Sequence, residues 1–130
     1  MLLFEDEHRC VRNKPADMVV HPGNKHTTDV TLHDLMQSYL HQTGQSQKSP
    51  TFTPSLCFRI DKDTSGIVIS AKTYDALQRL NEQIRERKTH KTYLALVAGR
   101  FDGYLDINDP LFRGYHKDTE KSHMFVNTEK

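Results

Sequence analysis

A chain of 130 residues, 35% of them hydrophobic, is long enough for one domain with a buried core. The mean hydropathy is −0.72 and no run approaches the roughly 18 apolar residues of a membrane helix, so no membrane span is predicted. Acidic residues directly follow Met-Leu-Leu-Phe, so no secretory signal peptide is predicted either. The net charge is only +1, but residues 51–100 contain nine basic and five acidic side chains, a net charge of +4. An anionic partner is therefore expected to contact that stretch.

Short apolar runs separated by turn-forming residues open the chain and predict strands over residues 2–4, 10–13 and 18–21. A helix is predicted over residues 31–43. Thr31 provides its N-cap, apolar side chains recur at helical spacing, and Gly44 follows as a stop signal.

The second half of the chain predicts more strands and one more helix. The strands are expected over residues 56–60, 67–71, 91–100 and 104–107, with a weaker one over 123–127. Thr73 caps a helix expected from residue 74 to about 88, with a basic last turn that suits the helix dipole. We expect a single α+β domain over residues 1–130, with a mixed, mainly antiparallel sheet and two helices packed on it.

The densest polar cluster is the segment Arg59–Gly66, which ends a predicted strand. Because side chains alternate along a strand, Phe58 is expected to face the core, whereas Arg59 and Asp61 share the opposite face. The neighbouring cation would keep the carboxylate ionised for use as a nucleophile or base. From the pattern alone, the alternative that Asp61 only caps a turn closed by Gly66 stays open.

Metal sites are not predicted. The acidic residues of the cluster match the first positions of a calcium-binding EF-hand loop, but Lys72 stands where the loop requires Glu and the flanking elements are strands. His33 and His41, two of eight histidines, share a predicted helix but lie too far apart for one ion. Cys10 and Cys57 lack metal spacing and are expected to be reduced core residues of a cytoplasmic protein.

A basic turn, Arg85–Lys91, leads into the predicted strand that carries Tyr93. It is read either as a solvated helix end or, beside a cleft, as a source of phosphate contacts, with an aromatic ring available to stack on a base. Tyr93 could equally be a core residue of its strand.

Three segments together resemble one family. Arg59–Lys72 closely resembles the catalytic motif of the RluA-type pseudouridine synthases, His-Arg-Leu-Asp-x-x-Thr-Ser-Gly-Leu followed by a short apolar strand and Ala-Lys. Asn13–Gly23 resembles the first motif of that family, and Lys91–Gly99 resembles its Lys-x-Tyr-x-Ala-Leu-Val-x-Gly strand. The resemblance covers about residues 2–113, in the right order and spacing.

The resemblance implies that selected uridines of structured rRNA or tRNA are isomerised to pseudouridine, without a metal or an organic cofactor. Asp61 matches the essential aspartate, which attacks the ribose or helps to break the glycosidic bond. Arg59 matches the arginine that helps to hold the flipped nucleotide, and Tyr93 matches the tyrosine that stacks on the uracil and assists proton removal. Lys91, which begins the third motif, is expected to bind the substrate.

The sequence also departs from the family pattern. Phe58 replaces the family's His, Asp17 replaces a Gly, and the later Gly-Arg-x-His-Gln-x-Arg-like motif has no counterpart in the 130 residues. The chain is therefore expected to be the N-terminal part of the catalytic domain, with an incomplete fold and little or no activity alone. The alternative is a truncated or degenerate RNA-binding relative without turnover. Exposed strand edges are expected to favour self-association.

Overall fold

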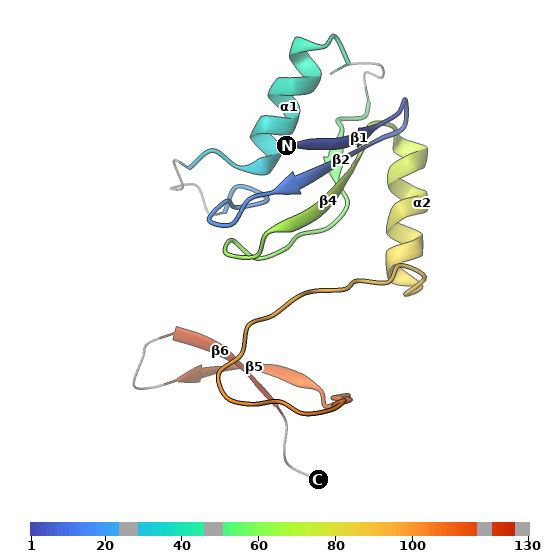
Figure 1. The fold of residues 1–130 in the computed structure, drawn as a ribbon. Coiled ribbons are helices and arrows are strands. Elements are labelled where there is room, and N and C mark those ends of the chain that lie inside the picture. The colour runs from blue at the N-terminus through green and yellow to red at the C-terminus, as the bar shows by residue number, and fades with distance from the viewer. Residues whose placement is uncertain (24–28, 46–50, 117–120, 127–130) are drawn as a thin grey trace. The chain divides into compact units, whose positions relative to one another are not determined.

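The computed structural model describes residues 1–23, 29–45, 51–116 and 121–126 (Figure 1). The chain divides into two compact units, residues 1–92 and residues 93–130. The first unit contains a four-stranded sheet and both helices, and the second contains a β-hairpin. Within the described residues, no helix is both long and apolar enough to cross a membrane.

The sheet of the first unit is antiparallel throughout, with the strand order β1-β2-β4-β3. Its strands are β1 (Leu2–Glu5), β2 (Arg9–Lys14), β3 (Ser55–Leu56) and β4 (Gly66–Ala71). The two central strands pair along their whole length, from Arg9 opposite Ala71 to Lys14 opposite Gly66. This register places the end of β2 beside the start of β4, so the first two family motifs meet at one end of the sheet.

Helix α1 (Leu32–Gln42) confirms the predicted helix and packs on the sheet. Thr31 and Asp34 form a reciprocal capping box at its start, and Gly44, with a φ of 69°, follows its end. The helix contributes apolar side chains to one core cluster with the sheet and the segment before the helix. The buried members of this cluster are Val20, Leu32, Met36, Leu40, Leu56 and Val68.

Polar side chains fix β1 to its neighbours. The carboxylate of Glu5 accepts a 2.8 Å hydrogen bond from Lys72 Nζ and a 2.6 Å bond from the hydroxyl of Tyr39 on α1. Lys72 also donates to the carbonyl of Asp6 at 2.6 Å. The guanidinium of Arg12 lies over the Tyr39 ring at 4.6 Å. These contacts connect the edge strand, α1 and the end of β4.

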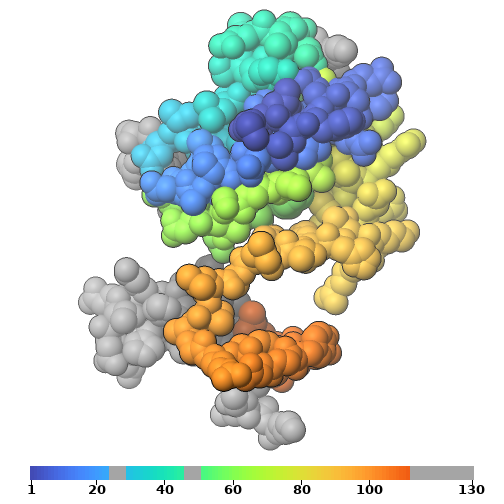
Figure 2. Space-filling view, viewed as in Figure 1, coloured from blue at the N-terminus to red at the C-terminus, as the bar shows by residue number. Residues whose placement is uncertain are grey.

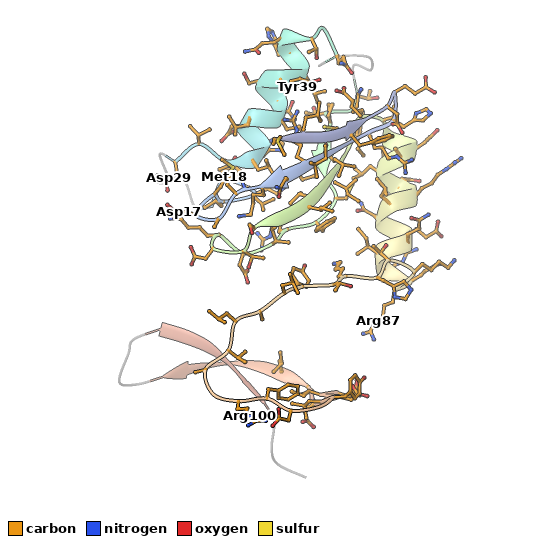
Figure 3. The ribbon with its side chains drawn as sticks, in the orientation of Figure 1. Asp17, Met18, Asp29, Tyr39, Arg87 and Arg100 are labelled. Carbon is orange, nitrogen blue, oxygen red and sulfur yellow. The ribbon has the colours of Figure 1, made fainter. Side chains whose placement is uncertain are left out.

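Helix α2 (Tyr74–Arg85) is capped by the Thr73 side chain and lies against β4. Its apolar stripe, Leu77, Leu80 and Ile84, is only half-buried. The helix ends three residues before the predicted limit, because Glu86 forms its C-cap and Arg87 has a left-handed φ of 55° (Figure 3).

The second unit differs most from the sequence-based prediction. Its hairpin joins β5 (Leu111–His116) to β6 (Lys121–Val126), of which only part of the second strand was expected; Asn127 lies outside the described residues. The strands predicted over 91–100 and 104–107 are wrong, since neither segment is a strand. In the first unit, the strand predicted over 18–21 is also wrong, and the strand predicted over 56–60 is reduced to β3. Leu94 and Leu96 are fully exposed. An apolar alternating pattern forms a strand only where a neighbouring strand supplies the ladder of hydrogen bonds.

Candidate active site

Two of the four predicted site residues, Arg59 and Asp61, lie in the segment between β3 and β4. Leu56 is buried and Ile60 packs against the core cluster, whereas Arg59 and Asp61 are exposed. The outward placement expected for Arg59 and Asp61 therefore holds, although of residues 56–60 only Leu56 belongs to a strand. The expectation that Phe58 faces the core is wrong, because a side chain outside a regular strand need not alternate between the two faces. Asp61 opens a turn, since its carbonyl accepts a 3.2 Å hydrogen bond from the backbone N–H of Thr64.

The segment before α1 lies beside this turn and completes a cavity of about 330 Å³. The cavity is lined by Val19, Val20, His21, Arg59, Ile60, Asp61 and Lys62. Its volume is at the lower end of the range for small-molecule sites, roughly 300–1,000 Å³. Residues of the motifs Asn13–Gly23 and Arg59–Lys72 thus share one concave surface. It includes Asp61 and Arg59, which the sequence analysis placed on the same face.

A buried lysine, Lys14, connects the turn after β2 to the loop that contains Asp61. The Lys14 side chain is fully buried, and its ammonium group donates hydrogen bonds to the carbonyls of Pro15, Met18 and Lys62 at 2.9, 2.7 and 2.8 Å. Burial lowers the pKa of Lys14, while the carboxylates of Asp63, Asp17 and Asp61 act in the opposite direction. Lys14 therefore holds the backbone on both sides of the site without entering the cavity.

Sequence reasoning did not assign a role to Lys14. The alternation of side chains along β2 could have indicated that Lys14 is buried, because Cys10, Arg12 and Lys14 share the buried face of this strand. A lysine on a buried strand face needs several acceptors, because an ammonium group without partners is costly to bury. This reasoning could have predicted a structural bond to a neighbouring loop, although not which carbonyls accept it.

Asp17 occupies the turn after β2 (Figure 3) and has a left-handed φ of 64°. This conformation explains why a glycine suits the position in the related motif, since only glycine adopts it at no steric cost. The Asp17 carboxylate lies 3.0 Å from Lys62 Nζ, which gives the two loops a second, solvent-exposed connection.

Phe58 stands where the related motif has histidine, and it is half-buried rather than part of the core cluster. The ammonium group of Lys91 lies 5.1 Å from the centre of its ring, a cation–π arrangement. The structure thereby brings Lys91 to the residue before Arg59. Cys57, on the other side of Phe58, is not a competing nucleophile, because burial raises its pKa to about 11.

Tyr93, the predicted stacking residue, belongs to the second unit, and 57% of its surface is exposed. It does not belong to a strand, so its side chain is not a core residue of one. Its role in stacking on the uracil and assisting proton removal stays a prediction.

The comparisons with known proteins agree with the motifs. The family model described as RNA pseudouridylate synthase matches residues 8–130. The chain belongs to this family. The ribosomal large subunit pseudouridine synthase D of Escherichia coli O6:H1 is 31% identical over 126 residues, which cover 97% of this chain and 36% of the relative. The synthase D of Xylella fastidiosa is 40% identical over 97 residues, covering 75% of this chain and 28% of the relative.

A solved structure gives the same fold. Human RNA Pseudouridylate Synthase Domain Containing 4 matches with a TM-score of 0.52 and 24% identity, over 67% of this chain and 30% of that one. The likeness supports the predicted α+β fold of a pseudouridine synthase catalytic domain. The chain spans about a third of the length of its curated relatives.

Proposed function

We propose that this chain contributes to an enzyme that isomerises uridine in RNA to pseudouridine, with Asp61 as the essential catalytic group. The observation that carries the proposal is the cavity in which Asp61 and Arg59 lie together beside the first family motif. A nucleotide that has left its base stack can enter a concave surface and meet the exposed Asp61 carboxylate there. A nucleotide that is still stacked inside a helix could not be reached in this way.

The reaction rearranges bonds within one nucleotide. The bond between uracil N1 and ribose C1′ breaks while the Asp61 carboxylate attacks or stabilises C1′. The detached uracil rotates and its C5 bonds to C1′, which releases the Asp61 carboxylate from C1′. The C5 proton then leaves and N1 gains a proton. Electrons and atoms balance without an external oxidant or group donor, so the proposal includes no cofactor.

Each remaining site residue has a separate role in the proposal. Arg59 holds the flipped nucleotide or the strand that it leaves, and Tyr93 stacks on the uracil and assists removal of the C5 proton. Lys91 contributes positive charge for the RNA backbone, in agreement with the net charge of residues 51–100. Ribosomal RNA is the favoured substrate, because the relatives from E. coli and Xylella are named for the large ribosomal subunit. The free cysteines fit the reducing cytoplasm.

Tritium release tests the proposal. RNA labelled at uridine C5 is incubated with the chain in molar excess, so that a slow single turnover is detectable. We expect release from the wild type and none from Asp61→Asn. The matched control is Asp63→Asn, which removes a carboxylate from the same turn that does not line the cavity and should retain release. Because the chain spans about a third of its relatives, we expect the release to be slow.

The second candidate function is RNA binding without turnover, which the exchange of the family's histidine for Phe58 favours. Saturable, salt-dependent RNA binding together with no tritium release from any of the three chains would support this candidate and contradict the catalytic one.

A further inference from the structure

His21 is a polar residue of the cavity to which neither the family resemblance nor the proposed mechanism gives a role. It is half-buried and lines the same 330 Å³ space as Arg59 and Asp61. Its position is fixed from α1. The backbone N–H groups of Leu32 and His33 donate to the carbonyls of Val19 and Val20, directly before His21, at 2.9 and 3.0 Å.

The His21 ring is stacked on a second imidazole. The rings of His21 and His33 have centroids 4.9 Å apart and an interplanar angle of 29°. Among the residues that the structure describes, the buried Nδ1 of His33 has no hydrogen-bond partner. The stack therefore covers one face of the His21 ring with another aromatic ring and leaves its nitrogen atoms as the groups able to form polar contacts.

The charges around His21 favour its neutral form. Burial lowers the pKa of His21, the neighbouring His33 and Arg59 lower it further, and Asp34 opposes them. Asp61 and Lys62, of opposite charge, lie on the walls of the same cavity. The lowered pKa favours the neutral form of His21, which offers one hydrogen-bond donor and one acceptor. A neutral imidazole suits the hydroxyl and amide groups of a nucleoside better than a phosphate, which cationic side chains bind.

We propose that His21 is a binding residue for the target nucleoside, hydrogen-bonding to the ribose or uracil of the uridine that occupies the cavity beside Asp61. This inference rests on the proposed function, because it assumes that the cavity receives a uridine. It assigns to the first family motif a direct contact with the substrate. Arg59 and Lys62, the cationic members of the cavity wall, are left to contact phosphate.

Nuclear magnetic resonance tests the inference with the 130-residue chain, and it requires no turnover. The imidazole resonances of His21 are followed while uridine is added, and in a parallel titration with inorganic phosphate. We expect uridine, but not phosphate, to shift the His21 resonances in a saturable manner at pH 7.5. Binding should weaken as the pH falls through the lowered pKa of His21, because protonation removes the imidazole acceptor and places a cation beside Arg59.

Two variants complete the test. His21→Phe keeps an aromatic ring against His33 and removes the polar nitrogens, so the affinity for uridine should fall by roughly fivefold. His41→Phe makes the same change at an exposed position in the last turn of α1 and should leave the affinity unchanged. The wild-type resonances keep the test decisive if His21→Phe folds poorly.

Several outcomes would overturn the inference. These are no detectable binding of uridine, binding that leaves the His21 resonances in place, a response to phosphate alone, or equal losses in the two variants. Tritium release that depends on Asp61 would in each case leave the proposed function intact. Conversely, uridine contact at His21 without tritium release would contradict the proposed reaction and not this binding site.

Discussion

At the scale of single residues, the candidate site depends on groups that do not line its cavity. Lys14 is the clearest case, since one ammonium group satisfies carbonyls from the turn after β2 and from the loop that contains Asp61. Asp17 adds a surface ion pair between the same two loops, in a backbone conformation that glycine would adopt more easily. A buried, fully paired cation is the stronger of the two connections, because exposed ion pairs contribute little.

We expect Lys14→Met to lower the free energy of unfolding by about 2–3 kcal/mol, because it leaves three carbonyl acceptors without their donor in a buried site. Urea denaturation at pH 7 measures the effect. Lys62→Met is the matched control. Its side chain is about half exposed and, within the described part of the chain, forms an ion pair only with Asp17. Its loss should therefore cost under about 1 kcal/mol, while its carbonyl still accepts from Lys14. Equal losses in the two variants would refute the role given to the Lys14 ammonium group.

At the scale of elements, Glu5 joins the edge strand β1 to α1 and to the end of β4. Burial by itself raises the pKa of Glu5, but hydrogen bonds from Lys72 and Tyr39 outweigh it, so the pKa lies below the usual 4.5. A carboxyl group whose pKa is lower in the folded than in the unfolded state stabilises the fold fully above pH 4.5. This contribution is lost as the pH falls through the folded-state value.

Glu5→Gln should therefore reduce stability at pH 7 by about 1–2 kcal/mol and reduce the loss of stability between pH 5 and pH 3. Urea denaturation across this pH range measures both effects. Glu7→Gln provides the control, since Glu7 is exposed and forms a surface ion pair with the exposed His8. If Glu5→Gln and the wild type lose stability in parallel below pH 4.5, the carboxylate does not supply the acid sensitivity.

The elements also show which structural features the sequence determines locally. Helix α1 was predictable because Thr31, its apolar repeat and Gly44 all act within the same dozen residues. The segment 91–100 has an equally clear apolar pattern, yet a strand there requires a partner that no local signal supplies. The same limit applies to the site. Alternation predicted that Arg59 and Asp61 share a face, but only the fold reveals that His21 joins them.

At the scale of the whole molecule, the sheet of the first unit has an exposed apolar edge. Among the described strands, β1 pairs with β2 alone, and its apolar side chains Leu2, Leu3 and Phe4 are 36%, 48% and 49% exposed. In Figure 2 this strand, in dark blue, lies at the surface. An edge strand with unpaired backbone groups and apolar side chains is a template for pairing with another chain.

We therefore expect the chain to self-associate through β1, with a mass in light scattering that rises with protein concentration. Leu3→Lys places a charge on this edge and should weaken the association by roughly tenfold, or about 1.4 kcal/mol. Leu35→Lys makes the same substitution on α1, where Leu35 is 42% exposed but lies on no sheet edge, and should change the association little. A monomer at every concentration, or equal effects of the two substitutions, would show that the free edge of β1 is not the contact.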